Sequence, residues 1–276
     1  MNVSEKITIR ERRQGFSLSG LGEVFRFRDT LAMMCWRDIA VRYKQSVIGV
    51  AWAVLQPVGT MIVFSVVFGQ LVGISSNGIP YPIFAYCGLL PWLFFQRSLV
   101  QGSASLVTLG PVLTKVYFPR LIAPAATVLT SLFDFVIAFG VLVLMMIWFG
   151  VWPGWPVVFL PAFLALALLA ALGFSLWLSV ANVEFRDVQH AMPFLIQVWM
   201  FATPIVYPMS LVPQQWRLLY SLNPMAVVVE GFRWSLLGGP APALGEIAVS
   251  AAVTAVVLVG GLLVFDRFTR SFADRV

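Results

Sequence analysis

Charge is the scarcest property of this sequence. Only 11% of its 276 residues are Asp, Glu, Lys or Arg, whereas 60% are hydrophobic, and the mean hydropathy is +0.90. A soluble domain of average composition carries about 25% charged residues. A chain this apolar could not cover its surface with polar side chains in water. The composition therefore predicts a protein whose solvent is partly lipid.

Cysteine and histidine are also scarce. The chain has two cysteines, Cys35 and Cys87, and a single histidine, His190. We expect no disulfide between these cysteines, because Cys35 lies before the first predicted span and Cys87 inside the second. One histidine cannot support a Ser–His–Asp set, and no carboxylate pair lies in a cleft-like context. We therefore expect neither a metal centre nor an enzyme.

Nucleotide-binding signatures are absent as well. The sequence holds no G-x-x-x-x-G-K-[ST] phosphate loop, so we expect no ATP hydrolysis by that route and no cofactor on this chain. The first long apolar run begins only after Lys44. An N-terminal signal peptide is therefore not expected.

Long uncharged runs are what the sequence does have. Residues 45–96, 135–183 and 247–265 carry no charge, and about 20 apolar residues suffice to cross a bilayer. Glycine and proline at 73–82 and 150–156 predict turns inside the first two runs. We therefore predict an all-α membrane protein with six transmembrane helices, at residues 47–72, 83–104, 121–149, 157–181, 190–208 and 244–265.

Lys and Arg are divided unevenly between the two sides of this topology. Six spans place both termini on one side, together with 16 of the 18 Lys and Arg residues, whereas only Arg217 and Arg233 fall on the other. Because cytoplasmic loops hold the excess of positive charge, we expect both tails, 1–46 and 267–276, in the cytoplasm. Topology thus accounts for the net charge of +6, and no nucleic-acid partner is expected.

The segment before the first span is partly amphipathic. Val24, Phe27, Leu31 and Met34 recur at spacings of three and four, which predicts a helix in the cytoplasmic membrane interface. Such a helix could be a membrane anchor or a docking surface for a cytoplasmic partner, and the pattern leaves both open.

Two further segments outside the spans are predicted to be helical. Pro111 and Pro119 mark the start and the end of a short helix within residues 109–120. This segment is either a simple turn between spans or a rigid helix that projects from the membrane. Prolines at 213, 224 and 240 divide residues 209–242 into two short apolar helices. We expect these two to be re-entrant or to lie at the outer interface.

Asp134 is a charge near the middle of the third predicted span. It shares a helix face with Thr127, Thr130 and Ser131, and a carboxylate at mid-depth costs about 2.5–3.5 kcal/mol. It is either a carboxylate buried by hydrogen bonds to neighbouring helices or a group that lines a transport path. A proton relay would want more than one such group.

Four segments together resemble a known family. "WRDIAVRYKQSVIGVAWAVLQP" (residues 36–57), "VYFPR" (116–120), "NVEFRDV" (182–188) and "LNPM" (222–225) are similar to the permease subunits of type-2 ATP-binding-cassette exporters, in the polysaccharide branch. The resemblance implies a homodimer in a bacterial inner membrane. It also implies two cytoplasmic ATPase subunits that bind ATP and Mg, and a lipid-pyrophosphate-linked glycan such as an O-antigen as cargo.

The resemblance also implies roles for particular residues. Residues 109–120 become a coupling helix that contacts the ATPase through Lys115, Tyr117, Phe118 and Arg120, and residues 209–242 become an outer gate. We expect three cations to receive the lipid pyrophosphate or, alternatively, general anionic lipid: Arg37, Arg42 and Lys44. The candidates for the lining of a polysaccharide pore are Phe64, Phe68, Phe94, Phe95, Asp134 and Phe201.

Three other functions remain open at this point. A permease of the same family could export a drug or another small amphiphile. An ion-coupled secondary carrier would need ionisable groups at mid-depth. A structural membrane scaffold would have no ATPase partner.

Overall fold

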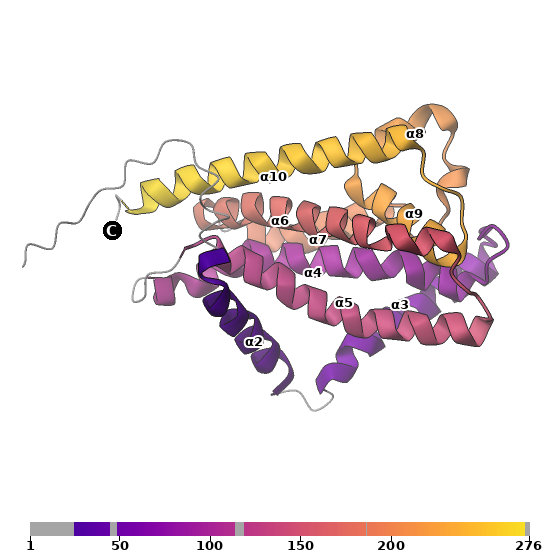
Figure 1. Cartoon of the computed structure of the whole chain (residues 1–276), viewed down its shortest axis with the longest axis horizontal. Helices are drawn as coiled ribbons and strands as arrows, with labels where there is room; N and C mark the ends of the chain where they lie inside the picture. Colours follow the sequence, from indigo (N-terminus) through magenta and orange to yellow (C-terminus); the bar gives the residue numbers. More distant parts are fainter. Residues whose placement is uncertain (1–24, 45–48, 114–118, 186, 274–276) are drawn as a thin grey trace, which may run out of the picture.

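The protein is helical throughout the part of the chain that its structure describes. The computed structural model describes residues 25–44, 49–113, 119–185 and 187–273, and every regular element within these ranges is a helix. Figure 1 shows long helices side by side, with the short helices α8 (Gln214–Tyr220) and α9 (Pro224–Leu237) toward one end. The predicted all-α class is confirmed.

Five stretches of helix are long and apolar enough to cross a membrane, and they coincide with five of the six predicted spans. The first is continuous from Gly49 to Leu71, through a 3-10 turn, α3 (Trp52–Phe64) and the π-helical segment η2 (Ser65–Leu71). The others are α4 (Tyr81–Leu113), α5 (Ile122–Phe149), α6 (Leu160–Glu184) with the preceding 3-10 turn η3 (Trp155–Phe159), and α10 (Leu244–Ala273).

The fifth predicted span, residues 190–208, is shorter in the structure. Its helix, α7 (Asp187–Phe201), has only 15 residues and contains Pro193. At about 1.5 Å per residue such a helix falls short of the roughly 30 Å of hydrocarbon. The chain leaves helical geometry after Phe201 and turns through residues 202–208. The structure therefore does not confirm a sixth membrane-spanning helix.

The predicted coupling helix does not begin as a separate element. The second span continues without a break through Gly110 and Pro111, and α4 ends at Leu113. The break expected near residue 109 is thus absent, because the helix that precedes Pro111 is already formed and continues through it. Residues 114–118 of the predicted coupling helix lie outside the described residues.

The central helix of the molecule is α4. About 78% of its apolar stretch is buried inside the subunit, compared with 17–28% for the other four spans. It lies against α5, α6 and α9, and its aromatic residues Trp92, Phe94 and Phe95 belong to the main hydrophobic core. The outer faces of the other spans keep large apolar side chains exposed, as helices that face lipid do.

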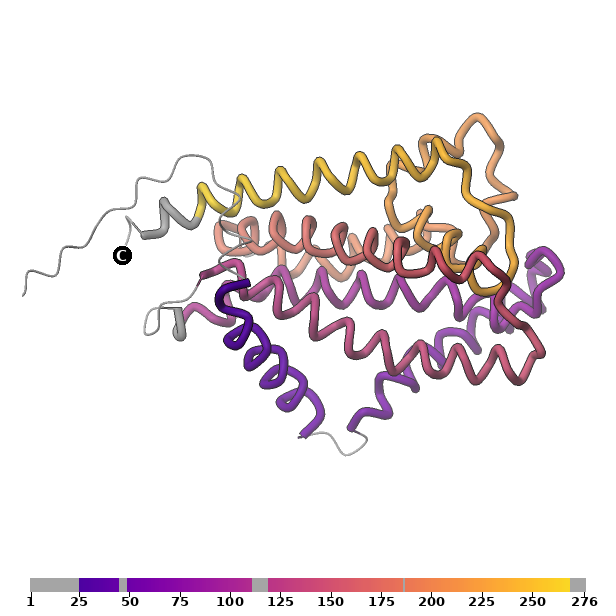
Figure 2. The backbone as a smooth tube through the Cα atoms, viewed as in Figure 1, coloured from indigo at the N-terminus to yellow at the C-terminus, as the bar shows by residue number. Residues whose placement is uncertain are grey.

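The helices run alternately from one end of the molecule to the other. In Figures 1 and 2, the start of α2 (Arg28–Lys44) and the final turns of α10 lie at the same end, whereas α8 (Gln214–Tyr220) and α9 (Pro224–Leu237) lie toward the opposite end. The helix α7 runs back from the end at which α6 finishes.

The N-terminal helix was predicted from its apolar spacing, and the structure confirms it as a helix. Met34 is buried, and Phe27, Leu31 and Cys35 pack beside it in a second hydrophobic cluster. The partners of this cluster come from the ends of α4, α5, α6 and α10. The helix α2 is therefore held against the bundle by its predicted apolar face.

Candidate functional site

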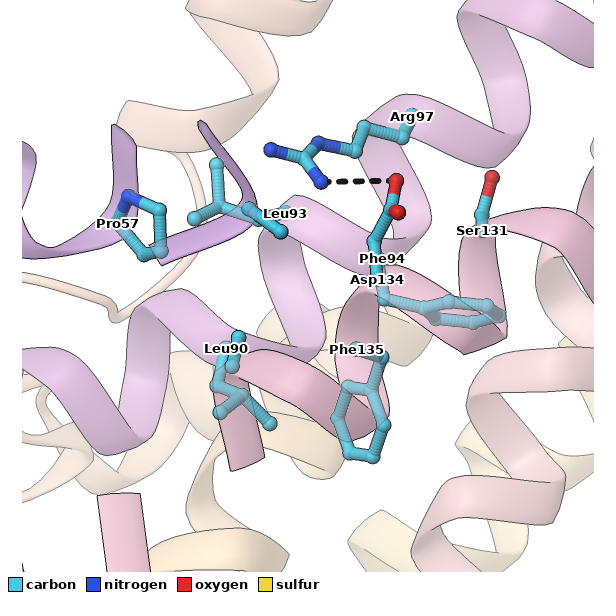
Figure 3. Close-up of a pocket in the computed structure, with 10 residues that line it drawn as sticks. Pro57, Leu90, Leu93, Phe94, Arg97, Ser131, Asp134 and Phe135 are labelled. Carbon is cyan, nitrogen blue, oxygen red and sulfur yellow. Dashed lines mark hydrogen bonds and ion pairs between the residues drawn. The ribbon is translucent and has the colours of Figure 1, made fainter. Parts of the chain in front are cut away.

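Asp134 is the meeting point of three helices. Its carboxylate on α5 accepts hydrogen bonds from Arg42 Nη1 and from the Tyr43 hydroxyl, both on the last turn of α2. Its Oδ2 also accepts a bond from Arg97 Nη1 of α4, at 2.9 Å. Figure 3 shows Arg97 and Asp134 facing each other above apolar side chains. Neighbouring residues at the end of α2 thus engage both oxygens of one carboxylate.

Two glutamines continue the network on either side. Arg42 Nη2 donates to Gln101 Oε1 at 2.6 Å, and Arg97 Nη2 donates to Gln56 Oε1 at 2.7 Å. Because Gln56 lies on α3 and Gln101 on α4, the network joins α2, α3, α4 and α5. We refer to Arg42, Tyr43, Gln56, Arg97, Gln101 and Asp134 as the Asp134 cluster.

The Asp134 cluster carries excess positive charge. Two guanidinium groups face one carboxylate, which leaves a formal charge of +1. The Asp134 side chain is only 3% exposed, whereas those of Arg42 and Arg97 are 25% and 20% exposed. Arg97 lies midway along α4 and Asp134 near the middle of α5. Charged groups at such positions in a membrane protein are expensive and are functional candidates by default.

Tyr43 enters the cluster as a hydrogen-bond donor. Burial raises the pKa of its hydroxyl to about 12, and the hydrogen bond to the Asp134 carboxylate acts in the same direction. At neutral pH the hydroxyl therefore stays protonated and donates a hydrogen bond to Asp134.

A pocket of about 440 Å³ opens beside the cluster. Its lining residues come from the end of α2, the start of the first span and the middle of α4 and α5: Arg42, Tyr43, Gly49, Trp52, Ala53, Gln56, Arg97, Gln101 and Asp134. A second, small crevice of about 10 Å³ lies on the apolar side of the Arg97–Asp134 pair, among Leu90, Leu93, Phe94 and Phe135 (Figure 3). This crevice has room for about one water molecule, so only the larger pocket could hold a ligand.

The three cations predicted to receive a pyrophosphate do not come together. Arg42 reaches the pocket, whereas Arg37 points to its neighbour Asp38, with an Nη2–Oδ1 distance of 2.8 Å. Lys44 is exposed at the last residue of α2 and does not line the pocket. The cation that accompanies Arg42 is Arg97 instead.

The phenylalanines predicted to line a pore divide into two groups. Phe94 and Phe95 are buried inside the subunit, at 2% and 1% exposure, and contact other aromatic rings there. Phe64 packs its ring edge-on against Phe68 at 5.6 Å, and Phe201 is 50% exposed. Of the five, Phe201 is therefore the one with a large free surface.

The predicted contact residues for the ATPase fall largely outside the described part of the chain. Lys115, Tyr117 and Phe118 belong to residues 114–118, which the structure does not describe. Arg120 is half-buried in the turn that leads into α5.

The segment 209–242 contains the two predicted short helices, α8 and α9, separated as expected at Pro224. Every residue of α9 except Trp234 is buried. Its Arg233 donates to the carbonyl oxygens of Pro204 and Ile205, at 2.6 and 2.5 Å, and its guanidinium lies 3.6 Å from the centre of the Phe84 ring. Arg233 was predicted to be an outer-loop cation, but it is almost completely buried.

Glu230 completes this second buried ion pair. Its Oε1 lies 3.3 Å from Arg233 Nη1 and accepts the Met209 backbone N–H at 2.7 Å. Asn223 caps the start of α9 and accepts a bond from Trp199 of α7. These contacts fix residues 203–209 over α9. A re-entrant path of α8 and α9 through the membrane stays a prediction.

Sequence reasoning identified Asp134 and Arg42 but missed Arg97, Tyr43 and the two glutamines as site residues. Arg97 was counted only as a cytoplasmic-side charge. The available signal was that Arg97 lies inside the second predicted span, opposite in sign to the charge inside the third. Two opposite charges within adjacent spans favour a pair.

Comparisons with known proteins agree with the fold and with the quoted motifs. The family model described as ABC-2 type transporter matches residues 30–237. The chain is 30% identical over 256 residues to the O-antigen export system permease protein RfbA of Myxococcus xanthus, covering 92% of this chain and 98% of that protein. It is 25% identical over 255 residues to the protein of the same name from Klebsiella pneumoniae, covering 92% and 96%.

A third similar protein carries a different name. The polysialic acid transport protein KpsM of Escherichia coli is 25% identical over 217 residues, which cover 76% of this chain and 82% of that protein. The family match spans well over half of the chain, and its helices long enough to cross a membrane fit a multi-pass transporter subunit. The resemblance predicted from the four sequence segments is thereby confirmed: the chain belongs to the ABC-2 type transporter family.

Proposed function

We propose that this chain is the transmembrane permease of an ATP-driven exporter that moves a lipid-linked polysaccharide of the O-antigen kind. The observation that carries the proposal is the similarity along nearly the whole length of the O-antigen export permease of Myxococcus xanthus. A shorter match to a polysialic acid transport protein extends the same cargo class.

The partners are those that the family resemblance implies. ATP and Mg belong to a separate cytoplasmic ATPase, of which two copies serve a homodimer of this chain, and the sequence itself shows no phosphate loop. Both termini face the cytoplasm of a bacterial inner membrane, in agreement with the distribution of Lys and Arg. A sixth crossing by α7 together with residues 202–208 would place both termini on the same side, as the distribution of Lys and Arg requires.

Within this assembly, the coupling segment at residues 109–120 contacts the ATPase. Tyr117→Ala combined with Phe118→Ala is expected to uncouple export from ATP hydrolysis while the permease stays in the membrane. The measurement is the amount of ATPase that co-purifies with the permease. Unchanged co-purification would remove these two aromatic residues from the contact.

The cargo enters at the cytoplasmic end of the first span, next to the end of α2. Arg37, Arg42 and Lys44 attract the lipid pyrophosphate there. Phe201, which is 50% exposed, offers an aromatic face to sugar rings on the path outward, and α8 and α9 serve as an outer gate.

The proposal is tested in a strain that has lost its own O-antigen permease and carries this chain with its ATPase. Surface polysaccharide should return with the wild-type pair. It should fail to return when the phosphate-loop lysine of the ATPase is replaced. No return of polysaccharide with a membrane-inserted wild-type pair would refute export of this cargo, and transport of a drug or another amphiphile would then be the function to measure.

One observation favours a second candidate, an ion-coupled carrier. Asp134 and Arg97 place two charged groups near the middle of two spans, and Arg42 of α2 joins them. Charged groups inside a membrane can mark an ion pathway. Transport in inverted vesicles should nevertheless respond to ATP and not to a proton gradient. Cargo movement after a pH step without nucleotide would establish the carrier instead.

A further inference from the structure

The pocket beside the Asp134 cluster has the size of a ligand site. Its volume of about 440 Å³ falls within the range of about 300–1,000 Å³ that small-molecule pockets occupy. Its lining combines Trp52, Ala53 and Gly49 with five polar or charged side chains of the cluster and the Tyr43 ring. The pocket therefore combines hydrogen-bonding side chains with a smaller apolar wall.

The donors that face the pocket are two guanidinium groups. Arg42 and Arg97 each direct one nitrogen to Asp134 and another to a glutamine oxygen. A guanidinium carries five N–H donors, so both arginines retain donors for a ligand. Their side chains are 25% and 20% exposed, whereas Asp134 is 3% exposed. Asp134 also lines the pocket, but the arginine side chains are the more exposed groups there, so they present most of the charge to a ligand.

Charge and hydrogen bonding together select an anion. The cluster keeps a formal charge of +1, which attracts an anion. Gln56 and Gln101 add adaptable groups, because an amide can turn its N–H₂ toward an incoming oxygen. One guanidinium group can bind a carboxylate through two parallel N–H···O hydrogen bonds. Two guanidinium groups therefore suit an anion with two phosphate groups.

We propose that this pocket binds a diphosphate group, held by Arg42 of α2 and Arg97 of α4, with Asp134 as the residue that positions both guanidinium groups. The inference rests on the proposed function, because a lipid diphosphate is the anion that such an exporter handles. It adds Arg97, Gln56 and Gln101 to the site and places the diphosphate deeper than the exposed end of α2.

The proposal gives Arg42 and Arg97 a different role from Arg37 and Lys44, the other two cations near the end of α2. Arg37 is engaged with Asp38 on the exposed face of α2, and Lys44 does not line the pocket. These two attract anionic headgroups toward the protein, whereas Arg42 and Arg97 contact the bound diphosphate.

The test measures binding of a labelled polyprenyl diphosphate to the full-length permease in nanodiscs. Arg97→Gln removes one fork but leaves Asp134 paired with Arg42 and Tyr43, so the fold should persist and its thermal melting can be checked. Loss of a charged hydrogen-bonding group is expected to weaken binding about tenfold or more. Arg28→Gln is the matched control, since Arg28 is an exposed arginine of the same helix α2, and its affinity should equal that of wild type.

Two competitors distinguish the source of the diphosphate. Displacement of the labelled lipid by inorganic pyrophosphate, and not by an equal concentration of sulfate, would support recognition of the diphosphate itself. Displacement by unphosphorylated polyprenol with no effect of pyrophosphate would overturn it, because the tail alone would then account for binding. Equal affinities of wild type, Arg97→Gln and Arg28→Gln would also overturn it.

Failure of the pocket can be told from failure of the proposed function. If the wild-type chain restores surface polysaccharide and Arg97→Gln restores it equally at the same membrane level, export stands and the pocket assignment falls. If the wild-type chain restores none, the proposed function itself falls.

Discussion

The Asp134 cluster and the Glu230–Arg233 pair both hide charge inside the same subunit, but their charges face different surroundings. Arg233 donates through its two Nη atoms to the backbone carbonyls of residues 204, 205 and 207 and to Glu230. Arg42 and Arg97 donate to side chains only and border a pocket of about 440 Å³. The first site is closed by its own chain and the second remains open.

This difference separates a structural charge from a binding charge. An arginine surrounded by main-chain carbonyls holds the loop that supplies them, and Arg233 in this way ties residues 204–207 to α9. An arginine that contacts movable side chains can exchange them for a ligand without breaking the backbone arrangement. Substitutions at the two sites should therefore affect stability and export in different proportions.

The largest loss of stability is expected from Arg233→Met. It leaves the Glu230 carboxylate buried without its charged partner, and breaking a buried ion pair in this way costs about 3–5 kcal/mol. Thermal denaturation of the purified protein in detergent measures the effect. Glu230→Gln added to Arg233→Met removes the orphaned charge and should recover part of the loss. If Arg233→Met alone melts at the wild-type temperature, Arg233 does not hold residues 204–207 against α9.

A smaller loss is expected from Asp134→Asn. Two guanidinium groups lose their common carboxylate, but both are partly exposed and can be hydrated through the pocket. We expect about 1.5–3 kcal/mol, the range for hydrogen bonds to charged groups. The same melting assay compares it with Arg233→Met. A larger loss for Asp134→Asn than for Arg233→Met would reverse the distinction between the open and the closed site.

The contacts between Arg233 and residues 204–207 can also be disturbed from the neighbouring helix α4. A Cβ at Gly88 would lie 2.7 Å from Arg233 Nη2 and 3.3 Å from the carbonyl oxygen of Ile205. Gly88→Ala should therefore cost about 1–3 kcal/mol through overpacking. Gly140→Ala, whose Cβ would meet nothing within 4 Å, is the control and should not destabilise. Equal melting temperatures for the two alanine variants would contradict the close approach at Gly88.

The smallest effect is expected from Tyr43→Phe. The change removes one donor to Asp134 while both arginines remain, so we expect a loss of about 1 kcal/mol. The pKa of Tyr43 is raised from 10.0 to about 12, so its contribution is fully present below pH 10 and is lost only as the pH rises through 12. The difference in melting between wild type and Tyr43→Phe should thus stay constant from pH 6 to 9. A difference that vanishes within this range would contradict a protonated donor.

The sequence predicted most of the helices because their signals are local. Uncharged runs located five spans, and prolines located the boundaries of α8 and α9. The predicted fifth span extends too far, to residue 208, because residues 202–208 are as apolar as a membrane span. The helix α7 ends at Phe201. The carbonyls of residues 204 and 205 are instead bent around Arg233, which is a tertiary contact that hydropathy does not contain.

The candidate site was only half predictable for the same reason. Asp134 was conspicuous as a charge inside a span, but its partners lie 37 and 92 residues away along the chain, at Arg97 and Arg42. The positive-inside pattern explained both arginines equally well as loop charges. Only the packing of α2 and α4 against α5 distinguishes a site residue from a topological one.

The most direct test of the open site is the amount of surface polysaccharide made by cells whose only permease is Arg42→Lys. Lysine keeps the charge but cannot bridge Asp134, Gln101 and a phosphate with a planar fork. With membrane levels matched to wild type and the ATPase bound, we expect export to fall about tenfold. Wild-type export by Arg42→Lys would show that position 42 supplies only charge, and the pocket would lose its role in cargo recognition.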